Sequence, residues 1–389
     1  MMQTSGVEQA GQVRPLVVRF GALGDMVLIQ PLIRQLSARY GAPVDILSAG
    51  SWTRKLYEGQ PGVGEIMLLE RRKLPYWLST EKKALVARLR QAGPRPVWYC
   101  DTHEGLLPLL ARAGLHEEHM VRARVEGFGD AHEHLVEFAQ RIAAVVPPAF
   151  RQLSLRPLLP AQDPVLAITP GMAEDVERWL QARHWAGRPL LLVQVGNRRT
   201  MRTGLRRKLA TNTKWWPESS WAAIIQMLAQ HHPEATILLI GAPAEAELND
   251  ELLRLARADN VWNVASELPI PRLLALQARA AGMISVDTGP AHTAAALGCP
   301  LVVLFGIANP IHIRPRGGDT PVLILQGETD GKPDMTAIGV EDVVSAWQRL
   351  PLRGMEADED WADDEGLVPP SSPDDDQRRS KAGQGIRPS

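Results

Sequence analysis

Cysteine is scarce in this sequence, and long apolar runs are absent. Only Cys100 and Cys299 occur among 389 residues, and each lies in an apolar stretch, where a thiol is usually a small buried hydrophobe. A disulfide framework is therefore excluded, which favours a reducing compartment. No apolar run approaches the length of a membrane span, and the polar stretch 1–14 lacks the apolar segment of a secretory signal. We therefore expect a cytoplasmic protein.

A strong charge of either sign is also absent. The formal net charge is -1, but the stretch 353–389 holds ten acidic and five basic residues, so residues 1–352 carry a net charge of +4. This balance is too weak for a nucleic-acid binder on charge alone. It suits a protein that handles phosphorylated or anionic partners.

The length and the pattern of the chain predict an α/β protein with two domains. Short apolar runs alternate with helical patterns in both halves, which is typical of parallel sheets covered by helices. The alternation is blurred by a proline-rich region around 147–170, where we place the boundary. We expect Rossmann-like domains at 14–165 and 166–352. The acidic tail 353–389 contains few large apolar residues and is expected to be disordered.

The periodicity predicts individual elements in each half of the chain. In the first half, strands are expected at 16–20, 44–47, 66–69 and 97–100, and helices at 26–40, 80–91 and 106–113. In the second half, strands are expected at 190–195, 235–241, 261–264, 283–286 and 301–305, and helices at 218–231, 244–258, 269–280, 289–297 and 340–350.

The first informative motif is the loop Gly-Ala-Leu-Gly-Asp at 21–25, between an expected strand and helix. Ligands of open parallel sheets bind beyond the carboxyl ends of the strands, and this loop lies at such an end. Its glycines allow close backbone approach, and Asp25 would face the ligand. The alternative is that Asp25 only caps the following helix, since aspartate is a preferred capping residue.

A second motif follows the strand expected at 283–286. Asp287 ends that strand, and Thr288 and Gly289 open a helix of small residues. The free amides and the positive dipole at such a helix start can bind a diphosphate. His292, in the first turn, would point toward the same pocket, although an isolated histidine is more often a core or surface residue.

Four segments in order resemble glycosyltransferase family 9, the ADP-heptose:lipopolysaccharide heptosyltransferases. They are VVRFGALGDMVLIQPLIRQL at 17–36, KWWP at 214–217, GAPAE at 241–245 and SVDTGPAHTAAALGCPLVVLFG at 285–306. The resemblance covers about residues 15 to 350, which fits the two-domain size of the family.

The resemblance implies a GT-B fold, with two Rossmann-like domains facing each other across a cleft that holds the active site. It also implies inverting transfer of a sugar from a nucleotide diphosphate, such as ADP-heptose, without a metal or another cofactor. Asp25 matches the position of the general base. The donor contacts implied by the resemblance are Lys214, Glu245, Asp287, Thr288, Gly289 and His292.

The implied acceptor is a lipid-linked anionic saccharide, the inner core of lipopolysaccharide. Gly24, Asp101 and His103 are its candidate contacts, although an ordinary loop explains the segment at 101–106 equally well. The basic segment 198–208 could hold acceptor phosphates or an anionic membrane surface, or be a solvated loop. If this segment binds a membrane, the cytoplasmic enzyme is peripheral at the inner face of the cytoplasmic membrane.

Neither of the histidine clusters at 116–119 and 132–134 has the HExxH arrangement, which puts two imidazoles on one helical face, and solvated histidines are favoured over a zinc site with an incomplete ligand set. No metal site is therefore expected. Trp215 and Trp216 could brace a nucleotide or a membrane edge, but core packing is the more frequent role of tryptophan.

Three other functions were weighed. A relative that uses another nucleotide sugar and acceptor would carry the same motifs. A nicotinamide-dependent oxidoreductase also suits two Rossmann-like domains, but no strand-loop-helix contains the GxGxxG fingerprint. A non-catalytic nucleotide-binding protein would not need Asp25, Lys214, Asp287 and His292 together.

Overall fold

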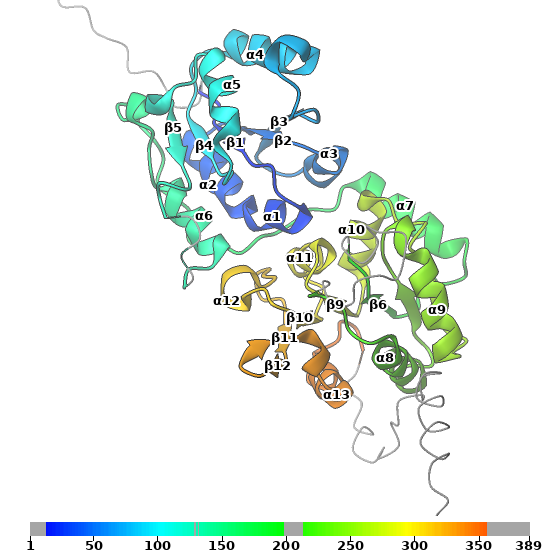
Figure 1. Cartoon of the computed structure of the whole chain (residues 1–389). Coiled ribbons are helices and arrows are strands. Elements are labelled where there is room, and N and C mark those ends of the chain that lie inside the picture. Colours follow the sequence, from blue (N-terminus) through cyan, green and yellow to red (C-terminus); the bar gives the residue numbers. More distant parts are fainter. Residues whose placement is uncertain (1–12, 128–129, 131, 198–212, 356–389) are drawn as a thin grey trace, which may run out of the picture.

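A computed structural model describes residues 13–127, 130, 132–197 and 213–355. The basic segment 198–208 and the tail from residue 356 onward lie outside the described residues, so the expectations for them stay predictions. Two parallel sheets, each flanked by helices, dominate the described part (Figure 1). The chain is thus mixed α/β, as the alternation in the sequence predicts.

The first sheet has the strand order β3-β2-β1-β4-β5, and its described strands all pair in parallel. Its central strands are buried on both faces, which explains their continuous apolar runs. The strands are β1 Leu16–Val18, β2 Val44–Ser48, β3 Val63–Leu68, β4 Val97–Tyr99 and β5 Met120–Arg122. The α-helices of this part are α1 Leu23–Leu28, α2 Gln30–Tyr40, α3 Ser51–Tyr57, α4 Thr80–Ala92, α5 Leu107–Arg112 and α6 Leu135–Ala143.

The second sheet has the order β11-β10-β9-β6-β7-β8, again in parallel. Its strands are β6 Leu190–Gln194, β7 Thr236–Leu239, β8 Val261–Asn263, β9 Gly282–Val286, β10 Leu301–Phe305 and β11 Val322–Gln326. The α-helices are α7 Pro170–Gln181, α8 Glu218–His231, α9 Ala246–Ala256, α10 Ile270–Arg279, α11 Gly289–Ala296, α12 Pro310–Ile313 and α13 Val340–Gln348. A short antiparallel pair, β12 Glu328–Thr329 and β13 Lys332–Pro333, follows β11.

One expected helix is two helices. The stretch 26–40 was predicted as a single helix, but α1 ends at Leu28, Ile29 separates the two, and α2 starts at Gln30. Pro31 explains the break, because its ring lacks an N–H and clashes with the carbonyl of the preceding turn. The start was wrong as well, since Leu23 to Asp25 belong to the first turn of α1 rather than to a loop.

Several elements were missed. The edge strand β5 has only three residues, and the edge strand β11 is only half-buried. Helix α7 begins inside the region that its prolines marked as a boundary, where Pro170 occupies the first helical position. Among the described helices, none combines the length and hydrophobicity needed to cross a bilayer.

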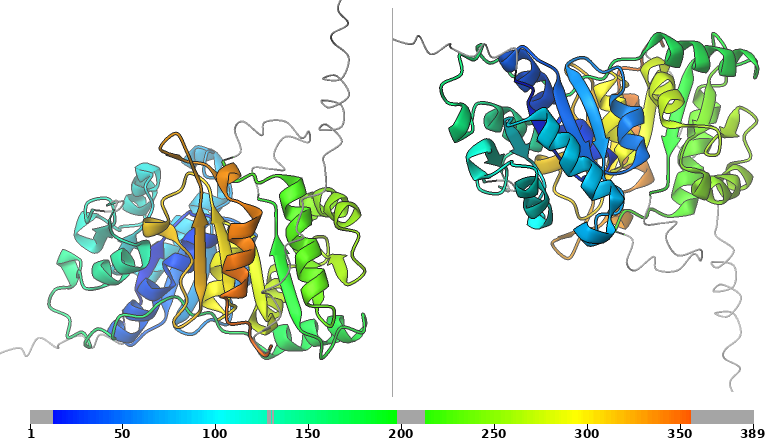
Figure 2. Two further views of the ribbon diagram at one scale, coloured as in Figure 1. Left: turned by 90° about the horizontal axis from the view of Figure 1, so that it is seen from below. Right: turned by 90° about the horizontal axis from the view of Figure 1, so that it is seen from above.

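The first part of the chain packs against the second at two places. Helix α1 lies against α11, and the stretch 133–137 at the start of α6 binds the segment 312–316 around α12 (Figure 1). Figure 2 shows the connection after α6 as an extended green segment that runs along both parts before α7. The limits of the two domains at 14–165 and 166–352 stay a prediction. Arg353, one residue beyond the second limit, is still bound to this part of the chain, because its N–H donates to the carbonyl of Ala281.

A buried histidine forms the polar part of the second contact. His134 Nδ1 accepts the N–H of Val136 at 3.1 Å, so Nε2 carries the proton that Arg314 O accepts at 3.0 Å. His312 Nδ1 makes a similar bond with the Glu133 carbonyl at 2.8 Å. Arg316 binds the Glu137 carboxylate at 2.8 Å. Burial lowers the pKa of His134 to about 4, which the bond to Arg314 opposes and the charge of Arg316 reinforces.

This contact predicts an acid-sensitive stability. Between pH 6.5 and about 4 the unfolded chain binds a proton at His134 that the folded chain does not, so stability falls as the pH is lowered through that window. His134→Asn keeps a capping side chain but does not titrate, and should show a smaller acid loss in urea unfolding at several pH values. The exposed neighbour His132→Asn is the control. Equal pH profiles for wild type and both variants would contradict the assignment.

Candidate active site

Asp25 lies in the first turn of α1, beyond the carboxyl end of β1. Its Oδ2 accepts the N–H of Ala22 at 2.6 Å, so the carboxylate does cap the helix, as the simpler alternative proposed. Its Oδ1 accepts a hydrogen bond from Arg19 Nη2 at 2.9 Å. The side chain nevertheless keeps 34% of its surface exposed, so capping and access to a ligand coexist.

Arg19 is a site residue that the sequence reasoning missed. Its side chain is only 10% exposed, and Nη1 donates to the carbonyl of Cys100 at 2.7 Å, so the guanidinium bridges the ends of β1 and β4 and fixes Asp25. One feature of the sequence could have indicated this role: Arg19 is a single basic residue inside the apolar run at 16–20. A buried arginine needs hydrogen-bond acceptors, so such a residue is expected to bind other polar groups.

Asp287, directly after β9, forms the centre of the second motif. The residue is only 2% exposed, and its Oδ2 lies 2.5 Å from Lys214 Nζ, which also donates to the Asp287 carbonyl at 2.6 Å. His292 Nε2 lies 3.8 Å from Oδ1, too far for a hydrogen bond. Burial alone would raise the pKa of Asp287, but the neighbouring His292 and the Lys214 cation hold that pKa below its usual range.

Thr288 precedes the first residue of α11 but does not cap the helix with its side chain. Its hydroxyl instead donates to the carbonyl of Val286 at 3.2 Å. The amides of a first helical turn have no intrahelical partners, and Thr288 leaves them to a ligand. Because Lys214 stands beside the same turn, an anion would meet both a helix dipole and an ammonium group.

The starts of α1 and α11 touch each other. A Cβ placed on Gly24 would lie 2.6 Å from Cδ2 of His292, and one placed on Gly289 would lie 2.7 Å from Cβ of Leu23. The ring of His292 therefore rests on the backbone of Gly24, and its Nε2 also approaches Asp287. This contact brings the carboxyl-end loops of β1 and β9 together.

Glu245 occupies a buried position beyond the end of β7. Oε2 accepts the N–H of Ala242 at 2.6 Å, whereas Oε1 is buried and has no hydrogen-bond partner among the described residues. Gly196 and Gly241 leave room for this carboxylate, since a Cβ on either would collide with it. Burial raises the pKa of Glu245, against hydrogen bonds from the Ala242 N–H and the Gln194 side chain. An unsatisfied buried carboxylate oxygen is typical of a site that awaits a donor from a ligand.

The candidate acceptor residues Gly24, Asp101 and His103 differ in how accessible they are to a ligand. Both carboxylate oxygens of Asp101 accept main-chain N–H groups, from Phe20 at 3.0 Å and from His103 at 2.9 Å. Asp101 thus ties the loop after β4 to the loop after β1. The side chain of His103 is exposed, and Gly24 is covered by His292.

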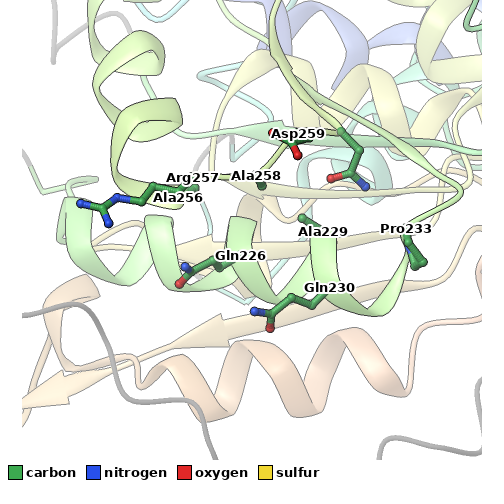
Figure 3. Close-up of a pocket in the computed structure, with 9 residues that line it drawn as sticks. Gln226, Ala229, Gln230, Pro233, Ala256, Arg257, Ala258 and Asp259 are labelled. Atoms are coloured by element: carbon green, nitrogen blue, oxygen red, sulfur yellow. The ribbon is translucent and has the colours of Figure 1, made fainter.

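Other patterns in the sequence fall outside this junction. Trp216 is buried, stacks edge-on with Trp221 at 5.0 Å and donates to the Ile338 carbonyl, so it is a core residue. Within the described ranges, no three histidine, cysteine or acidic side chains gather into a metal-binding group. A pocket of about 330 Å³ lies between the ends of α8 and α9, lined by Gln226 and Arg257 among others, and contains none of the candidate residues (Figure 3).

Comparisons with known proteins agree with this geometry. The family model described as glycosyltransferase family 9 (heptosyltransferase) matches residues 206–336. Lipopolysaccharide heptosyltransferase 2 of Salmonella typhimurium is 24% identical over 329 residues, which cover 80% of this chain and 87% of that protein. The solved ADP-heptose lipopolysaccharide heptosyltransferase II of E. coli superposes with a TM-score of 0.65 at 22% identity, over 86% of this chain and 97% of that one.

A second solved structure, the E. coli heptosyltransferase WaaC with ADP, has a TM-score of 0.59 at 19% identity over 85% of this chain and 98% of that one. The two parallel α/β sheets, which meet at their ligand-facing loops, have the GT-B fold of these neighbours. The family model over residues 206–336 and these relatives relate the chain to glycosyltransferase family 9.

The Gly24 contact yields a stability prediction. Alanine usually stabilises a helix relative to glycine by about 1 kcal/mol, but at position 24 the new methyl group collides with His292. Gly24→Ala should therefore lose about 1–3 kcal/mol in urea unfolding. The matched control is Gly171→Ala in α7, where nothing lies within 4 Å of the added carbon. If the two variants gain stability alike, α1 and α11 do not pack as described.

Proposed function

We propose that this protein is an inverting, metal-independent heptosyltransferase that moves a heptose from ADP-heptose to the core of lipopolysaccharide. The observation that carries the proposal is the contact of the α1 and α11 starts, which places Asp25 on one side and the Lys214–Asp287 pair on the other. One side thus offers a base and the other a positive site for a leaving diphosphate.

The names of the relatives support the choice of substrates. They include lipopolysaccharide heptosyltransferases 2 and 3, and one solved neighbour of 18% identity holds ADP-2-deoxy-2-fluoro heptose. The anionic character of both substrates suits the net charge of +4 over residues 1–352.

The proposed reaction is a single displacement. Asp25 accepts the proton of an acceptor hydroxyl while that oxygen attacks the anomeric carbon of the donor from the side opposite the diphosphate. The bond between the anomeric carbon and the phosphate oxygen breaks, its electron pair leaves with ADP, and the configuration inverts. Arg19 acts as a positioning residue, because its guanidinium holds Oδ1 of Asp25.

Charge on the departing ADP is balanced by the chain itself. Lys214 and the first-turn amides near Thr288 and Gly289 supply positive potential at one place. Asp287 orients Lys214 through two hydrogen bonds at 2.5 and 2.6 Å, which keeps the ammonium in place before the donor arrives. His292 is placed to contact the sugar between the two loops.

Glu245 is proposed to bind the nucleoside. Its buried, unpartnered Oε1 fits a ribose hydroxyl, which would donate the missing hydrogen bond. On the acceptor side, His103 is exposed and available, whereas Asp101 acts through the loop that it fixes.

Asp25→Asn tests the base. The amide oxygen can still accept the N–H of Ala22, so the fold should persist while turnover falls by about 10²- to 10⁴-fold. Transfer is measured with ADP-heptose and a lipopolysaccharide acceptor in the presence of a chelator, in which the wild type should remain active. Asp175→Asn removes another arginine-paired carboxylate, beside Arg272, and should leave turnover unchanged. Equal turnover for Asp25→Asn would remove Asp25 from this role.

Lys214→Met tests the donor site. Loss of the ammonium exposes the diphosphate to the Asp287 carboxylate, so the affinity for ADP measured by calorimetry should fall more than about tenfold. Lys332→Met, in β13, is the control.

In the wild type, a thermal-shift screen of ADP-, GDP-, UDP- and dTDP-sugars should give the largest shift with ADP-heptose. A larger shift with a sugar of another nucleotide would contradict the donor assignment.

A further inference from the structure

Three large apolar side chains project from the segment between β3 and α4. Trp77 is 69% exposed, Leu78 56% and Leu74 36%, and all three fall within five residues of one another. Water-facing apolar groups that gather in one short segment mark an interaction surface, whereas scattered ones do not.

Cations surround these side chains. The stretch 70–83 contains five basic residues and two acidic ones, a net charge of +3 in fourteen residues. The basic residues are Arg71, Arg72, Lys73, Lys82 and Lys83. Both carboxylates accept main-chain N–H groups: Glu81 accepts those of residues 70 and 71 within the segment, and Glu70 accepts the N–H of Gly50 outside it.

Hydrogen bonds hold the segment between β3 and α4 in one conformation. Lys82 Nζ donates to the carbonyls of Arg72 and Leu74 at 2.8 and 2.6 Å, and Ser79 caps α4 by accepting the N–H of Lys82 at 3.1 Å. A short helix at Tyr76–Leu78 presents Trp77 and Leu78 outward. The apolar side chains are therefore held out before any partner arrives, which lowers the entropy lost on binding.

The segment also adjoins the loop that carries the proposed base. It leaves the carboxyl end of β3, on the same edge of the sheet as the loop after β1. The guanidinium of Arg72 lies over the ring of Phe20 at 4.9 Å, and Phe20 directly precedes the loop 21–25. A surface bound by residues 71–78 would thus lie beside Asp25.

We infer that residues 71–78, with Lys82 and Lys83, form a docking surface for an anionic lipid membrane. Tryptophan and leucine side chains enter the headgroup boundary, and lysine and arginine beside them bind anionic headgroups. A saccharide phosphate alone would use the cations but not the exposed apolar groups. The inference extends the proposed function, because a lipid-linked acceptor would then be presented next to the base.

Vesicle sedimentation of the full chain tests the surface without any sugar substrate. Vesicles of phosphatidylethanolamine and phosphatidylglycerol should bind the wild type, with weaker binding at high salt and on pure phosphatidylcholine. The double variants Trp77→Ser/Leu78→Ser and Arg71→Glu/Lys73→Glu should each bind more than about tenfold more weakly. Matched controls in the second part of the chain are Trp262→Ser, which removes a tryptophan 45% exposed on β8, and Arg188→Glu/Arg254→Glu.

A second assay separates this inference from the proposed function. Transfer to a delipidated, water-soluble acceptor should be the same for the wild type and Trp77→Ser/Leu78→Ser, while transfer to vesicle-borne acceptor should fall in the variant. Vesicle binding equal to that of the wild type in both patch variants overturns the docking surface, whatever the transfer rate. Vesicle binding that depends on the patch, together with no transfer to either acceptor, would support the surface and contradict the enzyme activity.

Discussion

The arrangement described above depends on one contact, the packing of the His292 ring on the backbone of Gly24. Without a side chain at position 24, the start of α1 can approach α11 closely enough for the loops after β1 and β9 to meet. Beside this contact, the side chain of Leu23 packs in the same way on the backbone of Gly289. Close approach, and not backbone conformation, requires glycine at these two positions, because neither has a left-handed backbone.

From this contact follows a division of chemical roles. The first part of the chain contributes a carboxylate that is capped, paired with Arg19 and still partly exposed. The second contributes a buried aspartate that holds a lysine at a helix start. Positive potential at the leaving group and a base at the attacking group are the requirements of a displacement at an anomeric carbon. In the proposed mechanism, each is supplied by a different part of the chain.

The apolar pattern of the sequence was sufficient for most of the sheet and helix order, because central parallel strands are buried on both faces. It predicted β10 and α8 with their observed limits. It did not predict the break at Ile29, where Pro31 overrides a continuous helical period, or the edge strands β5 and β11.

The candidate site was predictable where a residue acts through a local motif, as Asp287 and Thr288 do at the start of α11. It was not predictable where a residue acts across the chain. Arg19 binds Cys100 over a separation of 81 residues, and no local pattern indicated this. Lys214, which only the family resemblance indicated, binds Asp287 over a separation of 73 residues. The hydrogen bond between His134 and the Arg314 carbonyl joins residues 180 positions apart, and no local pattern in the sequence predicts it.

The most direct test of the central claim is a crystal structure with a non-transferable ADP-heptose analogue. The diphosphate should contact Lys214 and the amides at the start of α11, and the anomeric carbon should face Asp25 with room for an acceptor hydroxyl between them. A diphosphate bound elsewhere, such as the pocket between α8 and α9, or an anomeric carbon turned away from Asp25, would contradict the account.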